Sequence, residues 1–341
     1  MEALVDHVKT LAKSCNAKTR REILDQLQSL CHSIESPDDT VQRISFLNLQ
    51  LAGLRIGADL KLFNILSESS SPLTIDQISK NTKANAVLLG IHRTLEHSYT
   101  LYQVNVLYRS YFAAAIHHYF DAMGPGIQEL PDLLKDTQYA DPEEITNTGI
   151  QRAWKTDLSL FLWFQEQPEE LSHFQHYLTM NRSGRPIFLD VYPVLEKTET
   201  NMDPERALFV DVCGGTSHDI QEWKPWHKDF IQPQTVKGAK FYYMRNIMHD
   251  WPDDKCRLIL KHLIDAMGPD SFILIDEMVL PNSGVHWQMA QLDMLMMAVL
   301  AARERTHEQW SKLLESAGLK INNIYTYTDT LKDSIIEAVP L

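Results

Sequence analysis

The chain has 341 residues, which is enough for two domains that each bury a core. Its formal net charge of −13 argues against nucleic acid or an anionic membrane as a partner, because neither attracts an acidic surface. The four cysteines form no CxxC pair, the amino terminus lacks a signal-peptide core, and the most apolar run, 292–302, is too short to span a bilayer, so we expect a soluble cytoplasmic protein.

Residues 1–110 are expected to form a helical domain. Apolar residues recur at helical spacing, most clearly from Val41 to Leu66. Thr74, followed three residues later by Gln77, predicts the capped start of a helix, and a turn and a second helix follow it. This order is typical of a winged helix-turn-helix. However, the second helix, NAVLLGIHRTLEHS, contains one arginine and no basic cluster to contact phosphates, so we do not expect nucleic acid there.

The rest of the chain divides near residue 200. Residues 111–200 are expected to be mostly helical, with a turn at 124–126. Beyond residue 201, short apolar runs alternate with helical segments, which predicts an α/β fold with a parallel sheet. The expected strands are 207–212, 239–246 and 272–280, and the expected helices are 252–267, 288–302 and a capped helix from Thr306 to Gly318. The last two strands, in INNIYTYTD and SIIEAVP, must pair antiparallel because too few residues join them for a crossover helix.

His249 and Asp250 stand at a position where ligands often bind. They follow the strand FYYMR and precede Pro252, which suits the first turn of a helix. They therefore lie beyond the carboxyl end of a strand, where open α/β sheets bind ligands. Position alone leaves two interpretations open: a ligand site, or a solvated His249 beside an Asp250 that only caps the helix.

Three segments carry a resemblance to a known family. VDVCGG, RNIMHDWPDDKC and ERTHEQWSKLLESAGL resemble the caffeate-type S-adenosylmethionine-dependent O-methyltransferases, especially the fungal secondary-metabolism branch. The resemblance covers nearly the whole chain. It implies a Rossmann-like methyltransferase sheet in 201–341, a winged-helix dimerisation domain in 1–110, and a connecting, pocket-lining segment in 111–200. It also implies a homodimer, a phenolic or polyketide-type acceptor and no metal ion.

The resemblance assigns catalytic roles to three residues. His249 matches the family's general base. A phenol has a pKa of about 10 and reacts poorly at neutral pH unless a base takes its proton, a role that suits histidine. Glu277, after the strand FILID, and Glu304, before the capped helix, match carboxylates that bracket this histidine. For both glutamates a solvated surface position is the alternative interpretation.

The resemblance also implies a site for S-adenosylmethionine. Two glycines match positions at the methionine portion, an acid–aromatic pair matches positions beside the adenine, and an arginine matches a cofactor contact just before the base. The residues expected at this site are Asp211, Gly214, Gly215, Asp229, Phe230 and Arg245. Ordinary core packing is the alternative for Phe230. Met294, Met296 and Met297, on the helix that lines the family's acceptor pocket, fit plain core packing better than a pocket.

The cofactor region is shorter than the family pattern. Only 25 residues, Thr216–Lys240, separate Gly215 from the strand at Phe241, whereas one βαβ unit takes roughly 30 or more. Pro225 ends the first helix early, and no acid stands at the position that would accept from the ribose hydroxyls. A second shortening, at 96–112, removes the wing.

Two functions therefore remain in view. The first is an O-methyltransferase acting on a hydroxyl of a secondary metabolite, with weakened binding of S-adenosylmethionine. The second is a methyltransferase-like protein that has lost methyl transfer and acts as a cyclase or pericyclase, or binds a partner. His249, Glu277 and Glu304 favour the first, and the missing ribose acid favours the second.

Overall fold

A computed structural model describes residues 2–45, 47–69, 71, 73–85, 109–181, 186–198, 205–212 and 233–341. The chain divides into two compact units, Met1–Arg109 and Ser110–Leu341. The expected second helix of the winged helix lies outside the described residues. So do Gly214, Gly215, Asp229 and Phe230 of the expected cofactor site.

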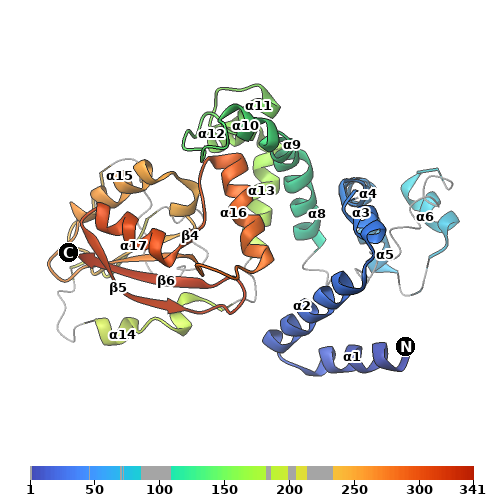
Figure 1. The fold of residues 1–341 in the computed structure, drawn as a ribbon, viewed down its shortest axis with the longest axis horizontal. Helices are drawn as coiled ribbons and strands as arrows, with labels where there is room; N and C mark the ends of the chain where they lie inside the picture. Colours follow the sequence, from blue (N-terminus) through green and yellow to red (C-terminus); the bar gives the residue numbers. More distant parts are fainter. Residues whose placement is uncertain are drawn as a thin grey trace. The chain divides into compact units, whose positions relative to one another are not determined.

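The regular structure of unit 1 within its described residues is entirely helical (blue to cyan in Figure 1). Its helices are α1 (Glu2–Ser14), α2 (Ala17–Ile34), α3 (Pro37–Ser45), α4 (Leu47–Asp59), α5 (Leu62–Glu68) and α6 (Ile75–Thr82). The capping box of Thr74 and Gln77 is formed as predicted. The apolar pattern expected to run through Val41–Leu66 is divided among three helices. Between α4 and α5, Lys61 adopts a left-handed conformation with a φ of 52°, which interrupts the helical backbone.

Unit 2 begins with a helical region. Its elements are α8 (Arg109–His117), the π-helix η4 (His118–Met123), α9 (Gly124–Gln128), α10 (Leu130–Asp136), α11 (Gly149–Trp154), α12 (Leu160–Glu166), α13 (Pro168–Asn181), η5 (Phe188–Asp190) and α14 (Val194–Lys197). The turn expected at 124–126 is wrong, since Pro125 opens the helix α9, where its missing N–H costs no hydrogen bond. A Cβ at Gly149 would overlap the carbonyl oxygen of Gly126, so glycine allows α9 and α11 to pack backbone to backbone.

A mixed sheet forms the rest of unit 2. Its strands are β1 (Phe209–Asp211), β2 (Phe241–Arg245), β3 (Phe272–Leu280), β4 (Arg305–Thr306), β5 (Leu319–Thr326) and β6 (Asp333–Pro340). The order is β1-β2-β3-β6-β5, and β4 pairs with the end of β3. The first three strands are parallel, while β6 runs antiparallel to both β3 and β5. The antiparallel pairing of the last two strands is therefore confirmed.

Both faces of the sheet are covered (Figure 1). On one face, Val210, Tyr242 and Ile273 pack with the helices α15 (Asp253–Ile264) and α17 (His307–Ser316). On the other, alternate strand residues such as Phe241 pack with Phe188 of η5 and with α14. This two-sided burial explains why the central strands read as continuous apolar runs. Among the described residues, β1 pairs with β2 alone, in keeping with the short interval that follows it.

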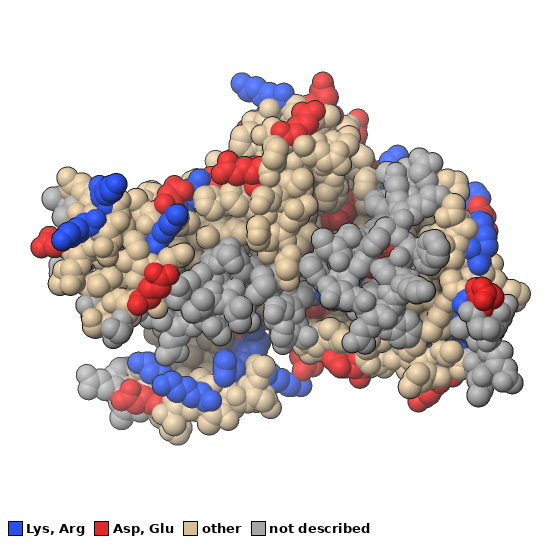
Figure 2. Space-filling model, turned by 180° about the vertical axis from the view of Figure 1, so that it is seen from behind, with Lys and Arg blue, Asp and Glu red and all other residues tan. Residues whose placement is uncertain are grey.

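Charged side chains are distributed differently over the two units. On the face shown in Figure 2, acidic and basic side chains are interspersed over the described surface of unit 2. In unit 1, exposed basic side chains gather along α1 and α2; they are Lys9, Lys13, Lys18, Arg20 and Arg21. Among the described helices, none combines the length and apolar character that crossing a membrane requires.

Candidate active site

A cavity in unit 2 lies between the helical region and the carboxyl end of the sheet. Side chains from η4, α12, α13 and α16 (Trp287–Leu300) form most of its wall, and these are largely apolar or aromatic. The segment after β2 supplies Asn246, His249 and Asp250, and Glu304 completes this polar side. His249 and Asp250 thus lie where β2 ends, as expected for a ligand site of a parallel sheet. Two further ionisable side chains line the cavity from other elements, His118 from η4 and Asp333 from the start of β6.

The three methionines of α16 occupy different environments. Met296 is buried and lines the cavity, as does the nearby Met278. Met297 packs into the helical core cluster, and Met294 is exposed. The prediction of plain core packing is therefore confirmed for Met297 and wrong for the exposed Met294, while Met296 is both part of the core and a lining residue of the cavity.

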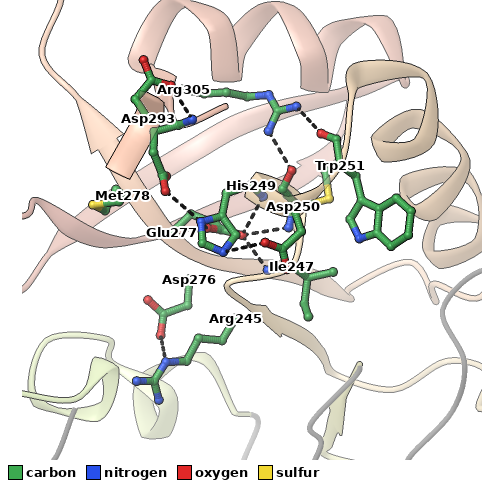
Figure 3. A network of polar contacts seen from close by, with 12 residues as sticks. Arg245, Ile247, His249, Asp250, Trp251, Asp276, Glu277, Met278, Asp293 and Arg305 are labelled. Atoms are coloured by element: carbon green, nitrogen blue, oxygen red, sulfur yellow. Dashed lines mark hydrogen bonds and ion pairs between the residues drawn. The ribbon is translucent and has the colours of Figure 1, made fainter. Parts of the chain in front are cut away.

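His249 lies on a single 3-10 turn, η6 (Met248–Asp250), directly after β2. Its Nδ1 is 2.8 Å from Oε1 of Glu304, and its Nε2 is 3.3 Å from Oδ1 of Asp250 (Figure 3). The ring is therefore held from both nitrogens by carboxylates. The histidine is oriented as a general base needs, but Asp250 stands at the nitrogen that would face an acceptor.

Glu277 acts on the backbone more than on the ring. Its Oε1 accepts hydrogen bonds from the N–H groups of Ile247 at 2.9 Å and Met248 at 2.8 Å. Its Oε2 is 3.9 Å from Nδ1 of His249 and has no hydrogen-bond partner within the described part of the chain. Glu277 is 1% exposed, so the alternative of a solvated surface glutamate is wrong. Its main contact fixes the turn that carries the histidine.

Glu304 is positioned by neighbours that the sequence did not reveal. Its backbone N–H donates to Oδ1 of Asp293 at 2.9 Å. The next residue, Arg305, is almost fully buried and donates to the carbonyl oxygens of Met248 at 2.8 Å and Trp251 at 3.0 Å. Arg305, the first residue of β4, thus connects this strand to the histidine turn. The only sequence signal was its adjacency to Glu304 in the segment ERTHEQW.

The cluster changes the protonation of its members. Burial alone would lower the pKa of His249. The negative charges of Glu304, Asp250 and Glu277 raise it by more than burial lowers it, so the pKa lies well above 6.5. Burial raises the pKa of Asp250 to about 6, and burial also raises that of Glu277 to about 7. The imidazole is consequently protonated at neutral pH until a proton leaves the cluster.

The same three residues are a possible set of metal ligands. His249, Glu277 and Glu304 offer ligand atoms within 4.8 Å of one another. However, Nδ1 of His249 already donates to Glu304, so a cation there would have to break that hydrogen bond.

Two of the expected cofactor residues are described, and both end parallel strands. Asp211 is the last residue of β1 and Arg245 the last of β2, so they share one edge of the sheet. Nε of Arg245 is 3.9 Å from Oδ2 of Asp276 (Figure 3). Asp276 is buried and also accepts from the hydroxyls of Tyr243 and Tyr327 at 2.7 and 2.6 Å. This network fixes the strand ends beside the histidine turn.

Comparison with known proteins decides the family. The demethylsterigmatocystin 6-O-methyltransferase of Aspergillus parasiticus is 34% identical over 382 positions, covering 100% of this chain and 98% of the relative. The chain belongs to the fungal, caffeate-type O-methyltransferases of secondary metabolism. The family profile described as O-methyltransferase domain matches residues 195–320. The alignment is longer than the 341-residue chain, so the relative contains positions that this chain lacks.

A second relative is similar in both sequence and structure. The O-methyltransferase lepI of Aspergillus flavus is 32% identical, over 94% of this chain and 94% of the relative. The structure of LepI in complex with SAM superposes with a TM-score of 0.92 at 29% identity, covering 100% of this chain and 98% of that chain. A structure described as a pericyclic reaction enzyme gives the same TM-score and identity. The family thus contains members that bind S-adenosylmethionine and members that catalyse another reaction.

Proposed function

We propose that this chain transfers the methyl group of S-adenosylmethionine to a hydroxyl of a phenolic or polyketide-type metabolite. The observation that carries the proposal is His249 at the cavity wall, held by Glu304 at 2.8 Å and backed by the buried Glu277. This arrangement suits proton removal from a weakly acidic hydroxyl. The relative from Aspergillus parasiticus, named as a 6-O-methyltransferase of demethylsterigmatocystin, supports methyl transfer to an oxygen of a metabolite.

The proton has a defined path in this proposal. The Nε2 proton of His249 passes to Asp250, whose Oδ1 is 3.3 Å away. Because burial raises the pKa of Asp250 to about 6, this transfer is less unfavourable than transfer to an exposed aspartate would be. Nε2 then takes the acceptor's hydroxyl proton while Glu304 stabilises the positive ring. The cofactor, when bound, supplies the electrophilic methyl group. The Asp250 side chain must then rotate away from Nε2, and it releases the proton that it has accepted to solvent.

The cofactor would lie at the edge where β1 and β2 end. Asp211 and Arg245 are there, and the resemblance adds Gly214, Gly215, Asp229 and Phe230. As part of the proposal, the mixed sheet of unit 2 is a shortened Rossmann-like methyltransferase sheet. Residues 111–200 then connect the domains and help to line the acceptor pocket.

The proposal includes a homodimer built on unit 1 as a winged-helix dimerisation domain. Helix α2 buries none of its residues within the chain, although it is rich in leucine. Exposed apolar side chains continue along α3 and α4; those on α2–α4 are Leu24, Leu27, Leu30, Ile34, Val41, Ile44, Leu47, Leu49 and Ile56. An apolar surface of this kind favours burial against a second copy.

One further function has support from a specific observation. The similarity to a pericyclic reaction enzyme, together with the 25-residue interval after Gly215, favours a protein that has lost methyl transfer and catalyses a cyclisation. Incubation with S-adenosylmethionine labelled in its methyl group and a panel of phenols separates the two. Label transfer that disappears in His249→Gln supports the methyltransferase. Absence of transfer to every phenol, with acceptors still bound, supports the alternative.

A further inference from the structure

The helical wall of the cavity carries a histidine that the mechanism does not use. His118 opens the π-helix η4, between α8 and α9, and lines the same cavity as His249. Short π-helical segments are rare and often occur at functional sites. The His118 side chain is only 5% exposed.

Aromatic rings enclose the His118 imidazole. It stacks on Phe174 with 5.1 Å between centroids and on Tyr177 with 5.3 Å, and Phe164 follows at 6.0 Å. The Tyr177 hydroxyl lies 2.9 Å from that of Tyr119, so its polar group is already engaged. The stack fixes the plane of the imidazole and keeps water away from it.

His118 has an unused hydrogen-bonding capacity. Its Nδ1 is fully buried and has no partner among the described residues, whereas Nε2 is not sealed in this way. Burial, followed by the charge of His173, lowers the pKa of His118 to about 4, so the ring is neutral near pH 7. A neutral imidazole has one N–H donor and one acceptor lone pair. Because a buried N–H without a partner is rarer than an unused acceptor, the tautomer with its proton on Nε2 is favoured.

We propose that His118 determines acceptor specificity by donating a hydrogen bond from Nε2 to the carbonyl oxygen of an aromatic ketone. This inference rests on the proposed function in one respect, that the cavity is the site where the methyl acceptor binds. It concerns binding of that acceptor and not methyl transfer. A donor held in an aromatic stack recognises one oxygen and leaves a buried group unpaired when that oxygen is missing. The cavity then has two polar ends, with His249 at the reacting hydroxyl and His118 at a carbonyl elsewhere on the ring system.

The test compares two probes that differ in one oxygen: a hydroxyxanthone and the matching hydroxyxanthene, which lacks the carbonyl. Their dissociation constants are measured on the full chain by calorimetry, without turnover. Wild-type protein should prefer the ketone by about 10- to 100-fold, the range for one buried hydrogen bond. His118→Phe keeps the stack but removes the donor, and should bring the ratio close to one. His118→Gln, which restores an N–H donor, should recover part of the preference.

His176→Phe is the matched control, because it replaces an exposed histidine of α13 that does not line the cavity; it should keep the wild-type ratio. Thermal unfolding checks that each variant is folded. A ketone preference that survives in His118→Phe would overturn the proposal, as would failure of wild-type protein to bind either probe. The outcome for this inference is independent of the outcome for the proposed function. If His118→Phe loses the ketone preference but the wild-type protein transfers no methyl group, the inference about His118 is supported and the proposed methyl transfer is not.

Discussion

Nε2 of His249 lies 3.3 Å from Oδ1 of Asp250, so the nitrogen that would face an acceptor hydroxyl already contacts a carboxylate. The opposite nitrogen is bonded to Glu304 at 2.8 Å. An acceptor therefore has to displace Asp250 before it reaches the base. Substitution of His249 should therefore change kcat, whereas substitution of Asp250 should change the pH dependence of kcat/KM.

Replacing His249 by Gln should lower kcat by about 10²- to 10⁴-fold, the usual share of general-base catalysis. Affinity for S-adenosylhomocysteine should change little, because the ring lies on the acceptor cavity. Label transfer measures the first quantity and calorimetry the second. A variant with near-wild-type turnover would remove His249 from the role of base.

The pH dependence should show an acidic limb. The base works only after a proton leaves the cluster, in which the pKa of Asp250 is raised to about 6 and that of His249 lies well above 6.5. The kcat/KM should therefore rise as pH increases past neutrality. Asp250→Asn removes one of the carboxylates that raise the His249 pKa, so the limb should move to lower pH. An unmoved limb would contradict the assignment.

Glu277→Ala and Glu304→Ala should differ in what they damage. Glu277→Ala leaves the N–H groups of Ile247 and Met248 without their acceptor and should lower the free energy of unfolding by about 2–6 kcal/mol, since each buried unpaired group costs about 1–3 kcal/mol. Glu304→Ala should mainly lower kcat, because its side chain bonds the ring. Denaturant unfolding and label transfer measure the two effects. Equal losses of stability in both variants would count against the division.

Unit 1 should form a twofold dimer in solution. The exposed leucines of α2 and the apolar residues of α3 and α4 need a partner surface, and an obligate interface buries about 2,000 Å² or more. Sedimentation at micromolar concentration should give twice the chain mass of 39.3 kDa. Leu27→Glu and Leu30→Glu together should shift the protein toward the monomer, while the exposed Leu195→Glu of unit 2 serves as a control. A compact monomer in the wild type would contradict this.

The sequence predicted elements whose signals are local. The strand 272–280 has the bounds expected from its apolar run, and the capping box of Thr306 and Gln309 opens α17 as expected. The break at Lys61 was missed, because the apolar spacing continues across it. An apolar run and a capping box involve residues close together in the sequence and can be recognised there, whereas the left-handed conformation of Lys61 leaves no mark in the apolar spacing.

The site was predicted as far as the family pattern reached. That pattern named His249, Glu277 and Glu304, which the structure brings together. Contacts between residues far apart in the sequence could not be predicted from it. Arg305 donates to the carbonyl oxygen of Met248, 57 residues earlier in the chain, and His118 contacts Phe174 and Tyr177 only because α13 folds back on η4. No periodicity or spacing encodes such pairs.

Binding of S-adenosylmethionine should be weak for a member of this family. By the resemblance to the family, Cys213 stands where the family has glycine, and a side chain there would crowd a backbone that must approach the cofactor closely. By the same resemblance Ser217 replaces a second glycine, but serine suits a helix start, so this change counts for less. The larger loss is the ribose acid, which no residue of the 25-residue interval replaces at the expected position.

The size of that loss follows from the missing hydrogen bonds. A charge-assisted hydrogen bond contributes about 1.5–3 kcal/mol, so losing two should weaken binding by about 10²- to 10⁴-fold. Titration with S-adenosylhomocysteine measures this directly, and Arg245→Met serves as a companion variant, since Arg245 ends β2 at the proposed cofactor edge. Weak binding that Arg245→Met weakens further places the residual site at that edge. A micromolar dissociation constant would instead show that the shortened region has rebuilt its contacts with the ribose, and would remove the main support for the cyclase alternative.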